Sequence, residues 1–227
     1  MDFLAVGILG SLWGSFANVC IYRLPLKGGV VKGRSFCPKC KKKIFWYENI
    51  PILSYLILGG KCSKCKKKIS TQYLLVEAIS IFSFLIIYYL FGISLTTILL
   101  IILFLSFLII FFIDLKYYII PDILTFPMMV LGFVKSFDPN LNPIFPNYTN
   151  SLLGGIIGYG IIWLIIMFYK KIRNREGMGL GDAKLLAVIG FWFGWISIPF
   201  VAFLSSVTAL IIVTPDLLKK SKKLTSE

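Results

Sequence analysis

LTTILLIILFLSFLIIFFID, residues 95–114, is a long uncharged apolar run that ends at a carboxylate. An apolar run of about 20 residues can cross the hydrocarbon core of a bilayer as a helix. The rest of the chain has the same character, because 58% of its 227 residues are hydrophobic and the mean hydropathy is +0.86. The sequence therefore predicts a protein that consists mostly of membrane helices.

Seven segments are predicted to be membrane helices. They are 3–22, 72–90, 95–113, 119–134, 151–169, 183–195 and 198–215. The fourth and sixth are short, which favours tilted, re-entrant or internally buried helices. The stretch 49–60 is too short to span a bilayer and is expected to form an interfacial or buried helical turn. The first segment has no basic n-region and no small-residue cleavage site, so we expect a retained helix and not a removed signal peptide.

The basic residues are unevenly distributed, and their positions predict the orientation. Thirteen of the 24 Lys and Arg residues lie between Arg23 and Lys68, and most others flank apolar segments. Cytoplasmic loops carry such an excess of positive charge. Loops 23–71 and 170–175 and the tail are therefore expected inside, and loop 136–150 outside. This distribution, without any aromatic-basic binding module, argues against nucleic-acid binding despite the net charge of +14.

Two CxxC pairs lie in the first cytoplasmic loop, and 21 residues separate them. They consist of Cys37, Cys40, Cys62 and Cys65. Each pair can present two thiolates on one turn, and two such turns complete a tetrahedral four-sulfur site for structural Zn2+. Neighbouring lysines would lower the thiol pKa values. A reducing cytoplasm favours zinc over a disulfide, although a redox pair remains an alternative. Cys20, within the first apolar run, is expected to be a small buried hydrophobe.

The chain has no histidine, so Ser-His-Asp, Cys-His and His-Glu-x-x-His chemistry is excluded. Acid–base chemistry must then use other groups, and two aspartates at membrane boundaries stand out. Asp114 ends one apolar run, and Asp182 follows the glycine-rich stretch GMGLG at 177–181. If the two carboxyls face each other, they cannot both ionise easily, and one proton is shared between them. The ionised carboxylate can then activate water while the protonated one polarises the carbonyl of the peptide bond to be cut. The alternatives are that Asp182 caps the helix that follows it and that Asp114 pairs with Lys116.

Two further acids have competing interpretations. Asp122 follows a proline and begins an apolar run, which is typical of a helix N-cap. Glu77 lies near the cytoplasmic end of the second membrane segment. It is expected either to cap or pair there, or to bind the amine of a substrate and assist its modification.

Several motifs, in order, resemble those of the bacterial type IV prepilin peptidases, and together they cover nearly the whole chain. They are GSFAN at 14–18 with IYRLP at 21–25, the two CxxC pairs, Tyr73 with Glu77, Ile113-Asp114 with Pro121-Asp122, and 177–182 with Lys184. The resemblance implies an all-α polytopic protein of about six to eight transmembrane helices, with a small zinc-bound cytoplasmic domain between the first two. The implied regions are a first helix (1–22), the zinc domain (23–71), an aspartyl protease domain (72–218) and a basic tail (219–227).

The resemblance also implies a function and residue roles. The enzyme would be a Gly-x-Gly-Asp protease of the bacterial inner membrane that cuts the basic leader of prepilins or pseudopilins after glycine, on the cytoplasmic side. It would then methylate the new N-terminal residue, usually Phe, from S-adenosylmethionine. Asp114 and Asp182 are the implied catalytic residues, and Gly60 matches a glycine associated with methylation. The implied secondary or substrate-contacting positions are Asp122, Glu77, Gly177, Gly179, Gly181 and Lys184.

Two other classes of function compete with this interpretation. A non-enzymatic secretion scaffold with a zinc knob would use the aspartates only as helix caps, so Asp→Asn changes would be nearly silent. A transporter would use the acids as a proton relay and leave peptides covalently unchanged. The sequence leaves open the oligomeric state and the particular pilin-like substrate.

Overall fold

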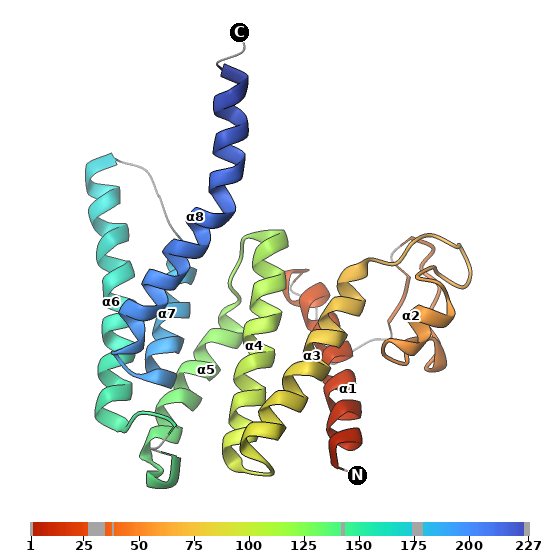
Figure 1. The fold of residues 1–227 in the computed structure, drawn as a ribbon, viewed down its shortest axis with the longest axis horizontal. Coiled ribbons are helices and arrows are strands. Elements are labelled where there is room, and N and C mark those ends of the chain that lie inside the picture. The colour runs from red at the N-terminus through yellow and green to blue at the C-terminus, as the bar shows by residue number, and fades with distance from the viewer. Residues whose placement is uncertain (1, 27–34, 38, 142–143, 174–178, 225–227) are drawn as a thin grey trace. The chain divides into compact units, whose positions relative to one another are not determined.

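The chain is almost entirely helical in a computed structural model that describes residues 2–26, 35–37, 39–141, 144–173 and 179–224 (Figure 1). Within these residues the only β-structure is two isolated bridges. Five helical stretches are apolar and long enough to cross a membrane: Asp2–Leu26, Thr71–Phe91, Leu95–Tyr117, Tyr148–Arg173 and Ser197–Thr214. The prediction of an all-α, multi-pass membrane protein is confirmed.

The first compact unit, up to Leu124, consists of three long helices and the cysteine loop. Its helices are α1 (Asp2–Arg23), α2 (Leu53–Ile57), α3 (Thr71–Phe91) and α4 (Leu95–Tyr117), with the 3-10 turns η1 (Leu24–Leu26) and η2 (Tyr47–Asn49). Helices α1, α3 and α4 pack against one another. Cys20 is 5% exposed in their apolar core, as predicted. The helical turn expected within 49–60 is α2.

A row of small residues lets α1 approach α3 closely. A methyl group on Gly14 would lie 2.9 Å from the Glu77 Cα atom and 3.0 Å from the Ser80 hydroxyl oxygen. Small residues at such positions are the usual way in which membrane helices come into backbone contact. The α1–α3 pair is therefore a tight contact in which Glu77 and Ser80 of α3 lie against Gly14 of α1.

The second compact unit runs from Thr125 to the C-terminus. It contains most of α5 (Asp122–Val134), then α6 (Tyr148–Arg173), α7 (Leu180–Phe193) and α8 (Ser197–Leu224), with the 3-10 turns η3 (Lys135–Phe137) and η4 (Pro139–Leu141). Here α6 packs most closely on α7, and glycines face backbone across the contact. Gly154 lies directly against Gly190, and a methyl group on Gly158 would lie 2.7 Å from the Leu186 carbonyl oxygen.

Buried polar bonds hold α7 within this unit. The Trp192 indole N–H donates to the Met128 carbonyl over 2.8 Å, and the Ser151 hydroxyl donates to the Phe191 carbonyl over 2.7 Å. Trp192 and Ser151 are both fully buried. Because unsatisfied polar groups are costly in an apolar interior, these bonds fix the rotation of α7 about its own axis.

Several of the predicted helix boundaries are wrong. The fifth segment runs from Tyr148 to Arg173 and not from 151 to 169, and the seventh continues to Leu224 and not to 215. The fourth segment becomes helical at Asp122 and not at residue 119, because a residue that precedes a proline is disfavoured in the helical conformation. The sixth begins at Leu180 and not at 183. The third continues past residue 113, so that Asp114 is inside its last turn. Helices α5 and α7 have only 13 and 14 residues, in keeping with the short segments expected.

Candidate functional site

Asp114 occupies the last turn of α4 with an exposed side chain. Its carbonyl oxygen accepts the N–H of Tyr118, the left-handed residue that ends the helix, over 2.9 Å. The considered pairing with Lys116 is wrong: no salt bridge joins these two described residues, and the lysine ammonium lies 5.1 Å from the Tyr117 ring centroid. Residues two apart on a helix do not face each other, which explains the difference.

Asp182 lies in the first turn of α7 with an exposed side chain. The N-cap residue of this helix is Gly179, so the alternative that Asp182 is the N-cap is wrong. The backbone N–H of Asp182 donates to the Gly179 carbonyl over 3.3 Å. A negatively charged side chain in the first turn of a helix interacts favourably with the helix dipole.

The residues around Asp182 are only partly described. Gly177 lies outside the described residues, whereas Gly179 and Gly181 lie at the start of α7. The Lys184 ammonium lies 5.3 Å from the centroid of the Phe126 ring. This contact is within the second unit and ties the first turns of α7 to α5.

Asp122 is the first residue of α5, where a carboxylate also interacts favourably with the helix dipole. Asp114 belongs to the first compact unit and Asp182 to the second. Their action as a catalytic pair therefore stays a prediction, as do the roles of Asp122 and of the glycines.

The four cysteines of the loop come together in a single cluster. Their sulfur atoms all lie within 4.8 Å of one another, and the Cys37–Cys65 and Cys40–Cys62 pairs are 3.9 Å apart. A tetrahedral centre with Zn–S bonds of about 2.3 Å places its sulfurs about 3.8 Å apart. Because a disulfide needs about 2.05 Å, these are four free thiols in an arrangement that could hold a metal ion.

The two halves of the cluster repeat the same backbone turn. The Cys37 carbonyl accepts the N–H of Lys41 over 2.8 Å, and the Cys62 carbonyl accepts that of Lys66 over 3.0 Å. Lys41 and Lys66 both have φ of 55°. Each pair of equivalent positions is 25 residues apart. The sequence signal for this repeat, CPKCKKKI against CSKCKKKI, was present, but only its CxxC part was used in the prediction.

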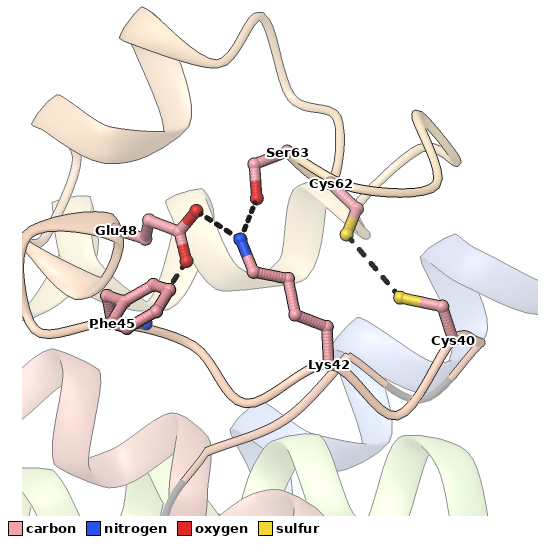
Figure 2. A network of polar contacts seen from close by, with 6 residues as sticks. All are labelled: Cys40, Lys42, Phe45, Glu48, Cys62 and Ser63. Carbon is pink, nitrogen blue, oxygen red and sulfur yellow. Dashed lines mark hydrogen bonds and ion pairs between the residues drawn. The ribbon is translucent and has the colours of Figure 1, made fainter.

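Lys42 connects the two halves (Figure 2). Its ammonium donates to the Glu48 carboxylate over 2.7 Å and to the Ser63 hydroxyl over 2.6 Å. The second Glu48 oxygen accepts the Phe45 N–H over 3.1 Å. The hydrogen bond from Lys42 is the main reason that the pKa of Glu48 falls to about 2. Sequence patterning missed this network, because it depends on the fold of the loop.

Backbone amides favour the thiolate form of one cysteine. Hydrogen bonds from the backbone of Cys65 and then Lys64 lower the pKa of Cys62 to about 6. We predicted that lysine ammonium groups would lower this pKa, but the largest contributions come from backbone hydrogen bonds. A thiolate is the form that binds metal.

Gly60 precedes the second cysteine pair in a conformation that suits glycine. Its φ is +66°, and a methyl group there would lie 3.0 Å from the ring of Tyr55. Its N–H donates to the Tyr55 carbonyl over 2.8 Å, and its carbonyl accepts the Ile69 N–H over 2.7 Å. Gly60 therefore joins α2 to the second turn of the cysteine cluster.

Lys135 is a buried lysine that was not predicted from the sequence. It is 5% exposed, donates to the Trp192 carbonyl over 3.1 Å, and lies 3.8 Å from the centroid of the Phe145 ring. Burial lowers the pKa of this lysine to about 7. The contact places a cation at the C-terminal end of α7, where the helix dipole is negative.

Comparison with known proteins gives two family matches in order along the chain. Residues 8–91 match the bacterial peptidase A24 N-terminal domain, and residues 101–214 match the type IV leader peptidase family. No solved structure matches the chain significantly.

Curated relatives carry the name prepilin leader peptidase/N-methyltransferase. The protein from Neisseria gonorrhoeae is 35% identical over 90% of this chain and 78% of its own length. The protein from Pseudomonas aeruginosa is 34% identical over 90% and 77%, and that from Vibrio cholerae 35% over 90% and 82%. The resemblance stated from the motifs is confirmed, and the chain belongs to the type IV leader peptidase family.

Proposed function

We propose that this chain is a prepilin leader peptidase and N-methyltransferase. It cuts the basic leader of type IV prepilins or pseudopilins after a glycine and methylates the new N-terminal residue, usually Phe. The ordered match of an N-terminal A24 domain and a leader peptidase domain is the observation that carries this proposal. Relatives that cover most of the chain have both activities in their names.

The proposed topology puts both aspartates at the cytoplasmic face of the bacterial inner membrane. If α1 starts outside and each of the long helices and α5 and α7 crosses in turn, the cysteine loop, the α6–α7 loop and the tail are inside. Those segments carry the excess of basic residues. Asp114 at the end of α4 and Asp182 at the start of α7 then share that face.

In the proposed reaction the two carboxyls divide the acid and base roles. The ionised carboxylate takes a proton from water as the water oxygen attacks the scissile carbonyl carbon, and the protonated carboxyl donates its proton to the carbonyl oxygen. The C–N bond then breaks, and the departing amine receives the proton held by the first aspartate. A hydroxyl of the intermediate returns a proton to the second aspartate as the new carboxyl group forms, so both aspartates regain their starting states. Both side chains are exposed, so water and an extended peptide can reach them.

The flanking positions have proposed substrate roles. Gly177, Gly179 and Gly181 permit the peptide backbone to lie close to the start of α7. Asp122 begins α5, and Lys184 follows the first turn of α7. At these positions they can orient the substrate or a catalytic carboxyl.

We assign a structural Zn2+ to the four cysteines. The sulfur spacing fits a Zn(Cys)4 centre, and four thiolates leave no open coordination position for catalysis. When bound, the ion cross-links two turns of a Lys-rich loop that has little apolar core of its own. Metal analysis of anaerobically purified protein should give one zinc per chain, and less than stoichiometric zinc would contradict the assignment.

S-adenosylmethionine is the proposed methyl donor, and the cysteine loop with Gly60 is the proposed region for this second activity. The test is co-expression with a type IV prepilin in cells fed methionine with an isotope-labelled methyl group, followed by mass spectrometry of the pilin N-terminus. Loss of the leader and gain of one labelled methyl group are expected. A leader that is retained with every member of a prepilin panel would contradict the function and favour a scaffold.

A further inference from the structure

Glu77 is a buried acid in the membrane unit that the proposed protease chemistry does not use. It is 7% exposed and lies on α3, where α3 meets the glycine row of α1. The Ser15 side chain of α1 is a hydrogen-bonding neighbour of its carboxylate. Burying an acid in a contact between membrane helices costs free energy unless its oxygens have hydrogen-bond partners. The main hydrogen-bond partner of Glu77 therefore indicates its role.

That partner belongs to the cysteine loop. The backbone N–H of Ile52 donates to the Glu77 Oε2 atom over 2.8 Å, across 25 positions of sequence. Ile52 lies between the two cysteine pairs and directly precedes α2, which is part of the loop beside the start of α3 (Figure 1). A hydrogen bond with a carboxylate acceptor is stronger than one between neutral groups.

Ile52, the donor of this bond, has an unusual backbone conformation. Its φ and ψ are 60° and −53°, a region that β-branched residues rarely adopt. Such a conformation persists only where surrounding contacts determine it. In this conformation the Ile52 N–H points at the Glu77 carboxylate.

From Ile52 the contacts continue to the cysteine cluster. Ile52 leads into α2, α2 carries Tyr55, and Tyr55 packs on Gly60 while accepting its N–H over 2.8 Å. Gly60 lies two residues before Cys62. A continuous series of bonded and packed groups therefore connects the membrane helix α3 to the residues with which methylation is associated.

Further polar groups lie near Glu77 in the contact between α1 and α3. The Asn18 amide donates to the Tyr73 carbonyl over 3.1 Å, and it is 4% exposed. Tyr73, Glu77 and Ser80 are spaced on one face of α3. The face that carries the Glu77 carboxylate is thus held toward α1 and the loop.

We propose that Glu77 is a positioning residue for N-methylation: its carboxylate holds the cysteine loop in register with the membrane unit through the Ile52 amide. This inference rests on the proposed function, because it concerns the methylation step. It predicts that the bond affects methylation and leaves leader cleavage, which the aspartates perform, largely unaffected.

The test compares Glu77→Gln with Glu77→Leu in the full-length protein, co-expressed with a prepilin. Glutamine retains an acceptor oxygen for the Ile52 N–H without the charge, and leucine fills the apolar contact without any acceptor. Methylation per cleaved pilin should stay within about threefold of wild type for Glu77→Gln and fall about tenfold or more for Glu77→Leu. Both variants should cleave the leader within about threefold of the wild-type rate.

A second measurement reports on the bond itself. Amide hydrogen exchange of the peptide that contains Ile52 should be faster in Glu77→Leu than in wild type and Glu77→Gln. Equal methylation loss in both variants would overturn the proposal and show that the charge is needed, as in binding of the substrate amine. Normal methylation by Glu77→Leu, or loss of cleavage together with methylation, would also overturn it. A wild-type protein that does not methylate would contradict the proposed function instead.

Discussion

Replacing Gly158 with alanine tests the tight α6–α7 contact that carries Asp182. The new methyl group would lie 2.7 Å from the Leu186 carbonyl oxygen, whereas ordinary contacts begin at 3.4 Å. The two helices must therefore separate by about 0.7 Å (3.4 − 2.7) at this point. Forcing an extra methyl group into a packed contact typically costs about 1–3 kcal/mol.

Gly160→Ala is a matched control on the same helix. A methyl group at Gly160 meets nothing within 4 Å. Both substitutions are in the interior of α6, so both gain up to about 1 kcal/mol of helix propensity, and this gain cancels in the comparison. The detergent-solubilised Gly158→Ala protein should therefore be less stable than Gly160→Ala by about 1–3 kcal/mol, measured as a lower midpoint of thermal unfolding.

The same substitution should reduce leader cleavage. A displacement of α7 moves Asp182 with it, and a misplacement of about 1 Å at a catalytic group can cost about 100-fold in rate. Initial rates of cleavage of a purified prepilin should fall roughly 10- to 100-fold for Gly158→Ala and stay near wild type for Gly160→Ala. Equal midpoints and equal rates for the two variants would refute the close backbone approach and the reasoning built on it.

Three further predictions follow from the contacts of other residues. Lys42→Met removes the link between the cysteine turns and leaves the half-buried Glu48 carboxylate without its ion-pair partner. A chelator should therefore strip zinc from this variant faster than from the exposed control Lys39→Met, and equal stripping rates would contradict this. Gly60→Ala should impair methylation more than Gly59→Ala. Both positions have positive φ, but only at Gly60 would the new methyl group meet the Tyr55 ring. Equal effects of the two substitutions would count against that contact. Burial lowers the pKa of Lys135 to about 7, so between about pH 7 and 10 the unfolded state binds more protons than the folded state and the stability rises with pH. Lys135→Met should flatten this rise, measured as unfolding midpoints across that pH range. An unchanged slope would contradict the assignment.

The sequence was sufficient for much of the fold because apolar length and basic flanks are local signals. Runs such as 95–113 predict membrane helices without knowledge of their neighbours, and the cysteine spacing predicts a four-sulfur cluster. Helix ends were less accurate, since Leu180 and Gly181 of the glycine-rich stretch before Asp182 join α7 in the folded protein. Small errors at helix ends changed the predicted capping role of Asp182.

Contacts between distant segments could not be read from the sequence. The Glu77 bond to Ile52 and the burial of Lys135 depend on which helices pack together, and neither residue carries a local motif for its partner. Glycines gave a partial signal: GSFAN was noted as a motif, but the packing of Gly14 on α3 follows only from the fold. The catalytic pairing of Asp114 with Asp182 rests on the family and the proposed topology.

The central claim is that Asp114 and Asp182 together cut the leader. The most direct measurement is leader cleavage of a co-expressed prepilin, read by intact mass, for Asp114→Asn, Asp182→Asn and the control Asp138→Asn, whose carboxylate accepts from Asn140 in an exposed turn. Each of the first two variants should retain uncleaved prepilin at normal enzyme levels, while Asp138→Asn cleaves as wild type does. Cleavage at the wild-type rate by either Asp114→Asn or Asp182→Asn would contradict the account, because asparagine can replace a helix-capping aspartate but not an acid or a base.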